Sequence, residues 1–419
     1  MLAAGVMPNL AALAGAGSLR RMTSVHPWVS SVAWTTLQTG VNPGKHGIYG
    51  FVDRDPATLK TYVPLANRIR YPAVWDRLGH VNRRVAILNV PVTYPAGPVN
   101  GLLVSGFLAP RLNEKSVYPS SLLGVLADLG YRIDTDPTLA RQSRDRALVD
   151  IADALERRLG VFLHLIEREE WDLFLGVVME TDRLHHFFYE AMETSHPIYA
   201  PAFFEVYRRI DGFIGQVRER LGERDVLMLV SDHGFCSIRR EVYYNHWLAE
   251  AGYLRLDAGG GLEVMRADSL AYALDPARLF LNLRGRERDG RVAAGGEYER
   301  LRDELIEAAE RLVTPDTGER VVERAYRRED VYSGPCLDAA ADVVLAPRDG
   351  FDPKGALRKE AFARQPDTIV GMHTYDDAFL YVGGREVPDR PVSILDVAPT
   401  ILALLDQPLP TDLDGVPLL

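Results

Sequence analysis

The chain has 419 residues, of which 47% are hydrophobic and 25% are charged, as is usual for a globular protein. Its formal net charge of −10 excludes a protein that binds nucleic acid through a broad basic surface. Two cysteines exclude a disulfide framework, and no apolar run approaches the roughly 18 residues of a membrane-spanning helix. We therefore expect a cytoplasmic protein with no membrane segment and no nucleic-acid-binding surface, and no pattern indicates its oligomeric state.

Helices and strands are predicted to alternate along the first 230 residues. The longer helices have apolar residues at helical spacing, and each leads into a short apolar run of the kind that forms a strand buried on both faces. This order is typical of a doubly wound α/β protein. The predicted elements are helix 3–13, a helix ending at 75–78, strand 85–90, helix 147–168, strand 173–178, helix 203–221 and strand 226–230.

The pattern changes after residue 248. Short strands such as Arg278–Leu283 and a helix over Tyr298–Leu312 indicate a smaller α+β insertion. The chain is expected to return to the core at 341–346, and to end with strand 378–382 and helix 394–405. We therefore expect a core in two parts, 1–248 and 341–419, that flank an insertion over 249–340.

Polar residues that suit a metal ion follow two of the predicted strands. Asp232 and His233 stand at the end of the run 226–230, although a His-Gly turn that only stops a strand would have the same sequence. After 173–178, Asp182 and His186 are four residues apart and would share a helical face if a helix begins near Thr181, an acceptable N-cap.

A third cluster, Gly371-Met372-His373, precedes the predicted strand 378–382. One Asp-x-x-x-His pair is usually a surface ion pair, and one loop histidine is usually solvated. Three such clusters beside strands instead indicate one polar site, because ligands of open α/β sheets bind at the carboxyl ends of strands.

The segment from Ser30 to Ile48, which contains Thr39-Gly40 and ends in Pro43-Gly44-Lys45-His46-Gly47-Ile48, resembles the nucleophile segment of the type I phosphodiesterase/nucleotide pyrophosphatase branch of the alkaline phosphatase superfamily. Counting back nine residues from Thr39 to the family's nucleophile position selects Ser30. Three further motifs fall in family order: 89–95, 332–335 and 396–401. The resemblance implies an alkaline-phosphatase-like three-layer α/β/α sandwich around a mostly parallel sheet.

The resemblance also implies a site with two divalent metal ions. Asp182, His186 and His373 would hold one ion, and Asp232 and His233 the other, with the Ser30 hydroxyl bridging toward it. Metal coordination is one of few ways to activate a serine hydroxyl at neutral pH, and the implied chemistry is hydrolysis of a phosphate ester through a phosphoserine intermediate. Zn²⁺ is the expected metal, and Mn²⁺ or Fe²⁺ would fit the same ligands.

Two departures from the family pattern bear on this expectation. In the family, a strand upstream of the helix at 3–13 ends in an Asp that completes the second ligand set, whereas here no Asp occurs before Asp53. We therefore expect that this strand is missing and that the second metal binds weakly. The family's Asn three residues beyond the nucleophile is Ala33 here, which weakens the case for nucleotide specificity.

Several neighbouring residues are expected to have other roles. His185 is not expected to bind metal, because the spacing selects His186. His46 is expected to hold a structural turn, and Cys236 to be a core thiol. Arg183 is expected either to contact a substrate anion or to pair with a carboxylate.

The predicted activity is hydrolysis of small-molecule phosphate esters, of the phosphodiesterase or nucleotide pyrophosphatase kind. A phosphomonoesterase of the same fold is one alternative, and a catalytically impaired binding homologue is another, because of the missing Asp. A sulfatase is disfavoured, since no Cys/Ser-x-Pro-x-Arg run surrounds Ser30.

Overall fold

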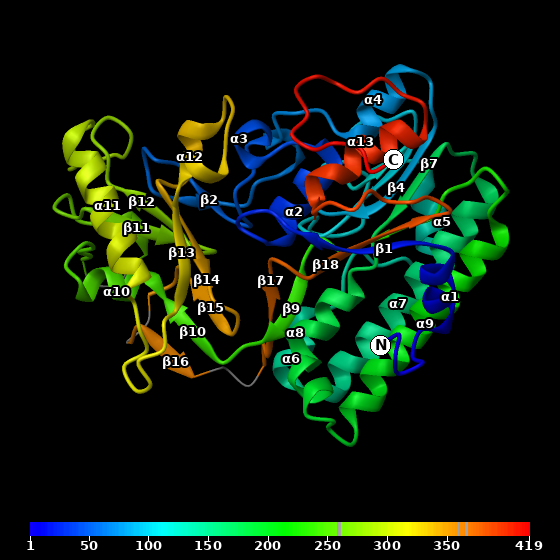
Figure 1. The fold of residues 1–419 in the computed structure, drawn as a ribbon, viewed down its shortest axis with the longest axis horizontal. Helices are drawn as coiled ribbons and strands as arrows, with labels where there is room; N and C mark the ends of the chain where they lie inside the picture. The colour runs from blue at the N-terminus through cyan, green and yellow to red at the C-terminus, as the bar shows by residue number, and fades with distance from the viewer. Residues whose placement is uncertain (258–260, 358–359, 365–367) are drawn as a thin grey trace.

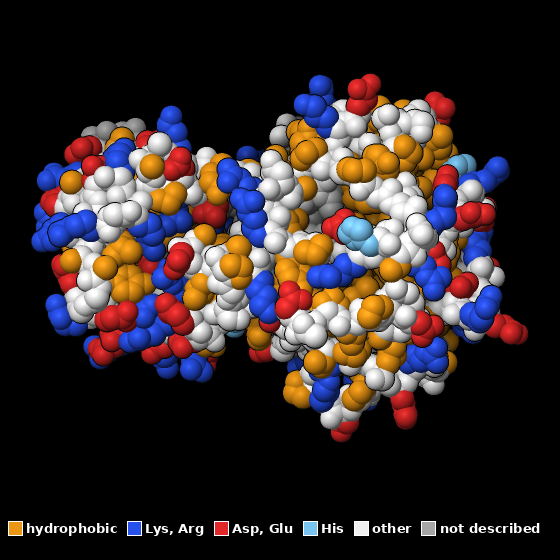
Figure 2. Space-filling view, turned by 90° about the horizontal axis from the view of Figure 1, so that it is seen from above, with side chains coloured by type: hydrophobic (Ala, Val, Ile, Leu, Met, Phe, Trp, Pro, Cys, Tyr) orange, Lys and Arg blue, Asp and Glu red, His pale blue; other side chains and the backbone are white. Residues whose placement is uncertain are grey.

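The computed structural model describes residues 1–257, 261–357, 360–364 and 368–419. The chain forms a larger and a smaller lobe (Figure 1). Seen from above, the two lobes meet at a narrower waist (Figure 2). Within the described residues, no helix is both long enough and apolar enough to span a membrane.

Two four-stranded sheets form the centre of the larger lobe. All their strands run parallel to their neighbours except β6 and β18, which are antiparallel. The first sheet has the order β6 (Val117–Tyr118), β5 (Gly101–Ser105), β4 (Val85–Val90) and β7 (Leu173–Gly176). The second has the order β19 (Val392–Ser393), β1 (Gly17–Thr23), β18 (Ala378–Gly383) and β8 (Met228–Val230).

Helices cover both faces of these sheets (Figure 1). Strand side chains alternate between the layers: Leu380 of β18 packs in one hydrophobic cluster and Tyr381 in the other. The expected three-layer α/β/α arrangement is therefore confirmed. One layer holds α2 (Ser30–Thr39), α4 (Val74–His80) and α13 (Val397–Leu404); the other holds α1 (Pro8–Ala16), α5 (Leu122–Asp128), α7 (Arg144–Arg168), α8 (Glu180–Glu193) and α9 (Tyr199–Arg220).

The smaller lobe has its own sheet and hydrophobic core. The sheet order is β11 (Ala271–Leu274), β12 (Arg278–Leu281), β14 (Val343–Pro347) and β13 (Val322–Arg327), and α10 (Tyr244–Glu250) and α11 (Gly296–Glu310) pack against it. A second sheet has the order β15 (Phe351–Lys354), β10 (Arg240–Tyr243) and β16 (Phe362–Arg364).

The position of β14 corrects one expectation. Residues 341–346 were expected to return to the core, but β14 pairs with β12 and β13 inside the smaller lobe. An apolar run that is buried on both faces looks the same in either lobe, so its partners decide where it belongs. As domains, the ranges 1–248, 249–340 and 341–419 stay a prediction.

Two further expectations meet a mixed outcome. A helix does begin near Thr181, but Met179 is the N-cap of α8, and the Thr181 hydroxyl donates instead to the carbonyl of Val178 at 3.1 Å.

The predicted burial of 173–178 and 226–230 is wrong in part. β4 is buried throughout, whereas β7 and β8 are only half-buried and Gly176 is exposed, because both are edge strands.

Candidate metal and phosphate site

Four separate segments bring the six predicted site residues together. β8 ends beside the site, and its continuation carries two of them; the pair β9 (Gly234–Ser237) and β17 (Gly371–Thr374) lies between the lobes (Figure 1). The residues are Ser30 at the start of α2, Asp182 and His186 in α8, Asp232 and His233 after β8, and His373 in β17.

Asp182 is at the centre of the first group of contacts. Its Oδ1 lies 3.2 Å from Nε2 of His373 and 3.6 Å from Nε2 of His186, and the two imidazole Nε2 atoms are 3.1 Å apart. The spacing of four residues explains the first pair, because it places both side chains on one face of α8. Pairing between β9 and β17 sets His373 opposite Phe235, two residues after His233.

Ser30 and His233 form the second group. The Ser30 Oγ lies 3.1 Å from Nε2 of His233, which is 3.3 Å from Oδ2 of Asp232 and 4.0 Å from Oδ1 of Asp182. Among the described residues, Oδ2 of Asp232 is buried without a hydrogen-bond partner. Asp182 thus lies between the two predicted ligand sets. One possible ligand atom from each of Asp182, His233 and His373 lies within 4.8 Å of the other two, so these three residues could hold one metal ion.

Backbone carbonyls orient two of the imidazoles. Nδ1 of His186 is 2.8 Å from the carbonyl oxygen of Gly371, and Nδ1 of His233 is 3.1 Å from that of Gly234. Because a carbonyl oxygen only accepts, Nδ1 carries the proton in both rings. The lone pair of each neutral imidazole is then on Nε2 and faces the site, which is the form that binds metals.

The pKa values of Asp182 and of two histidines favour ligands ready for a cation, whereas that of Asp232 does not. Burial by itself would raise the pKa of Asp182, but the neighbouring His186, His373 and Arg183 hold it well below its usual value. Burial lowers the pKa of His373 to about 3 and also lowers that of His186. Burial raises the pKa of Asp232, and the charge of Asp182 acts in the same direction. An ionised carboxylate beside neutral imidazoles is the protonation state that metal binding requires.

The residue types therefore fit a divalent ion. Oxygen and nitrogen ligands of this kind suit Zn²⁺, Mn²⁺ or Fe²⁺. The unpartnered oxygen of Asp232 supports this fit, because a buried polar atom without a partner is costly and a cation would satisfy it. The number and identity of the ions stay predictions.

Two neighbouring residues have the structural roles expected of them. His185 points away from the cluster: its Nε2 lies 2.7 Å from the Tyr207 hydroxyl, and its ring stacks on Phe203. Arg183 pairs with Asp134, so the ion-pair alternative holds.

His46 and Cys236 also lie apart from the site. His46 is buried in α3 (Pro43–His46), where its Nε2 contacts the Thr36 hydroxyl at 3.0 Å. Cys236 lies in β9 and is only half-buried, so it is not the core thiol that was expected, although burial raises the pKa of its thiol to about 12.

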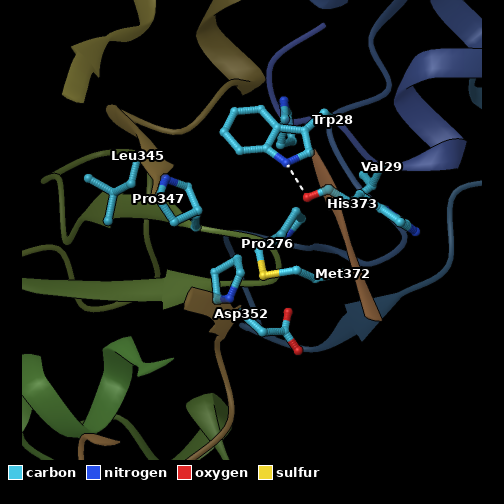
Figure 3. Close-up of a pocket in the computed structure, with 11 residues that line it drawn as sticks. Trp28, Val29, Pro276, Leu345, Pro347, Asp352, Met372 and His373 are labelled. Atoms are coloured by element: carbon cyan, nitrogen blue, oxygen red, sulfur yellow. Dashed lines mark hydrogen bonds between the residues drawn. The ribbon is translucent and has the colours of Figure 1, made fainter. Parts of the chain in front are cut away.

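Trp28 is a contact that sequence patterns did not indicate. Its indole N–H donates to the carbonyl oxygen of His373 at 3.0 Å, and Figure 3 shows the ring at the edge of a pocket. The cavity beneath it is small, about 50 Å³, and Pro276, Leu345 and Met372 line it. Trp28 thus holds the backbone of a predicted ligand, through a bond that depends on tertiary contact and leaves no spacing signal.

Two solved structures illustrate the likeness in fold. Phosphonoacetate hydrolase from Sinorhizobium meliloti 1021, in complex with phosphonoformate, is 16% identical with a TM-score of 0.64. Human ectonucleotide pyrophosphatase/phosphodiesterase 5 is 14% identical with a TM-score of 0.56. Each comparison covers 96% of this chain and 91% of the other, and at these identities the likeness shows the fold alone. Among curated proteins, none matches the chain significantly.

Residues 1–376 match the model of the type I phosphodiesterase/nucleotide pyrophosphatase family, so the chain belongs to this family. It is a phosphoric ester hydrolase, as membership of this family indicates. The resemblance inferred from the motif at Ser30 is thereby confirmed.

Proposed function

We propose that the chain hydrolyses phosphodiester or pyrophosphate bonds of small molecules, with Ser30 as the nucleophile. The observation that carries this proposal is the position of the Ser30 Oγ, 3.1 Å from Nε2 of His233 at the edge of the carboxylate and imidazole cluster. Ser30 is also the first residue of α2, and its side chain is buried.

Each part of this arrangement serves the reaction. Because Nδ1 of His233 donates to a carbonyl, its Nε2 accepts a hydrogen bond from the Ser30 hydroxyl and places the oxygen beside the cluster. A metal ion held by His233 would replace that proton between Nε2 and the serine oxygen. In the first turn of α2, the N–H groups of Val32 and Ala33 donate to the carbonyl of Val29, so those of Ser30 and Ser31 remain to attract a phosphate anion. Divalent ions, when bound, would favour the serine alkoxide and neutralise charge on the phosphoryl oxygens.

The reaction proceeds in two displacements at phosphorus. The Ser30 Oγ forms a bond to phosphorus while the bond to the leaving oxygen breaks, and the leaving group takes up a proton. Water then attacks the phosphoserine, forms the product phosphate and returns the proton to Ser30 Oγ. We propose two ions, with Zn²⁺ as the metal. Asp182, His186 and His373 would hold one ion, and Asp232 and His233 the other.

The cellular location is part of the proposal. Cys236 and Cys336 are both free thiols, which supports a reducing compartment such as the cytoplasm.

Ser30→Ala tests the nucleophile, and the adjacent Ser31→Ala is a matched control. Both serines are buried in α2, and the Ser31 hydroxyl has no hydrogen-bond partner among the described residues. We expect Ser30→Ala to lower kcat at least about 1,000-fold with unchanged metal content, and Ser31→Ala to keep most of the activity. Equal turnover of the two variants would refute the role of Ser30.

A substrate panel tests the reaction class. Bis-p-nitrophenyl phosphate, p-nitrophenyl phosphate and a dinucleotide would be compared by kcat/KM. The diester or the dinucleotide is expected to be preferred. Preference for the monoester would make the chain a phosphomonoesterase, and no turnover of any of the three with metal supplied would refute the proposed substrates.

A further inference from the structure

The arginine that follows Asp182 in α8 is held on two edges and on one face. Nε of Arg183 donates to Oδ1 of Asp134 at 3.0 Å, and Nη2 of Arg183 contacts the other oxygen of the same carboxylate. The guanidinium carbon lies 4.8 Å from the centre of the Phe107 ring. On the remaining edge, Nη1 of Arg183 lies 3.5 Å from Oδ2 of Asp182. Only 13% of the Arg183 side chain is exposed, so these contacts fix the guanidinium in one orientation.

A helix by itself does not bring Arg183 to Asp182. Consecutive residues of a helix point in directions about 100° apart, so their side chains do not normally meet. Here Asp134, which lies 49 positions before Arg183 in the loop between α5 and α6 (Pro137–Gln142), anchors the far edge of the guanidinium. The contact between Arg183 and Asp182 therefore depends on tertiary structure.

The loop that carries Asp134 is tied to the start of α8 at two points. Nη2 of Arg158 donates to the carbonyl of Ile133 at 2.9 Å, next to Asp134. The same guanidinium pairs with Glu180, the first residue of α8, at 2.9 Å. Asp134 thus reaches Arg183 from a loop whose distance to α8 is already set by Arg158.

The two oxygens of Asp182 face different partners. Oδ1 lies 3.2 Å from Nε2 of His373 and 3.6 Å from Nε2 of His186, whereas Oδ2 lies beside Arg183. A carboxylate can bind a metal through one oxygen or through both, and groups outside the ligand set decide its orientation. The contact with Arg183 engages one of the two oxygens and leaves the other facing the imidazoles.

The same contacts disfavour Arg183 as a substrate-binding residue. Arginine recognises a phosphate best through two parallel N–H groups of its fork. Asp134 already occupies the edge formed by Nε and Nη2, and Phe107 covers one face. The third edge faces Asp182, so the guanidinium is placed to act on a predicted metal ligand.

We propose, given the metal site of the proposed function, that Arg183 is a positioning residue. Held by Asp134, it keeps Oδ2 of Asp182 turned from the metal and leaves Oδ1 as the ligand atom of this carboxylate. One carboxylate oxygen among imidazoles suits the low coordination number of Zn²⁺, whereas a second carboxylate oxygen would favour Mn²⁺. Arg183 thereby contributes to the choice of metal.

Arg183→Met tests this role, because Met keeps an extended side chain that can pack on Phe107 but has no charge and no donor. The dissociation constants of Zn²⁺ and Mn²⁺ would be measured on chelator-treated protein by competition with a chromophoric chelator. Their ratio is the informative quantity, because a change of charge near the site acts on both dications alike. We expect the preference for Zn²⁺ over Mn²⁺ to fall at least about 10-fold.

The visible absorption of bound Co²⁺ is a second readout, because the bands weaken as the coordination number of Co²⁺ rises. We expect weaker bands in Arg183→Met than in the parent chain. Arg183→Lys keeps the charge but not the fork that Asp134 holds, so it should behave like Arg183→Met. Asp134→Ala should shift both readouts in the same direction, and should add nothing further when combined with Arg183→Met.

Arg132→Met is the matched control. It removes an ion pair from the same loop, made with Asp150 of α7 at 2.7 Å, and leaves Arg183 in place. Both readouts should keep the values of the parent chain. Circular dichroism would show that all these variants are folded.

Several results would overturn the proposal. One is a Zn²⁺ preference and a Co²⁺ spectrum that do not change in Arg183→Met. Others are parent-like readouts in Arg183→Lys, and an effect of Asp134→Ala that adds in full to that of Arg183→Met. A parent chain that binds none of the three ions would remove the metal site and this role together. Because no readout uses turnover, a chain that binds metal as expected but hydrolyses no phosphate ester would refute the proposed activity alone.

Discussion

The buried histidine of α3 makes the stability of the protein depend on pH in a way that can be calculated. His46 is fully buried; its Nδ1 accepts from the N–H of Ile48 at 3.1 Å, so Nε2 carries the proton and donates to the Thr36 hydroxyl. A second proton would have to displace the Ile48 bond. Burial accordingly lowers the pKa of His46 from 6.5 to about 3.

The sign of the effect follows from proton binding. Between pH 6.5 and 3 the unfolded chain binds a proton at His46 and the folded chain does not, so the stability from this residue is present above pH 6.5 and is lost as the pH falls. The loss between pH 7 and pH 5 is about 2 kcal/mol of the free energy of unfolding.

His46→Asn isolates this contribution, because the Asn side-chain oxygen can accept from Ile48 but does not titrate. The variant is expected to be less stable than the parent chain at pH 7. In urea unfolding, the difference in the free energy of unfolding between the two chains should be smaller by about 2 kcal/mol at pH 5 than at pH 7. His80→Asn, at an exposed position, is the control. If this difference in the free energy of unfolding changes by less than about 0.5 kcal/mol between pH 7 and pH 5, the reasoning is refuted.

Two further predictions concern the site and the core. Asp182→Asn should weaken metal binding at least about 100-fold, because the Asp182 Oδ1 lies within 3.2 Å of His373. His185→Gln, the control, should leave the metal content unchanged. Inductively coupled plasma mass spectrometry after gel filtration measures the metal content of both variants. Glu180→Gln should lower the free energy of unfolding by about 3–5 kcal/mol, because it leaves the buried guanidinium of Arg158 without its counter-charge at 2.9 Å. In urea unfolding, the double variant Glu180→Gln/Arg158→Met is expected to recover part of this loss. If Glu180→Gln alone kept full stability, the prediction would be wrong.

Local patterns in the sequence were enough to predict the long helices and several of the core strands. Strand 85–90 and the helices over 147–168 and 203–221 are present with ends that differ by a few residues. The spacing of Asp182 and His186 predicts their shared face on α8, and the motif after Ser30 predicts the family. These features depend on residues that are a few positions apart in the sequence. The helix and strand periods set the relative positions of such residues.

Only the tertiary structure decided which distant segments meet. The pairing of β9 with β17 brings His373 close to His233. The pairing of β14 with β12 keeps β14 in the smaller lobe. An apolar strand carries no mark of its partner, because its backbone groups are the same in every sheet. For that reason the sequence predicted β7 and β8 as fully buried, and only the fold shows them as two open edges around one cavity.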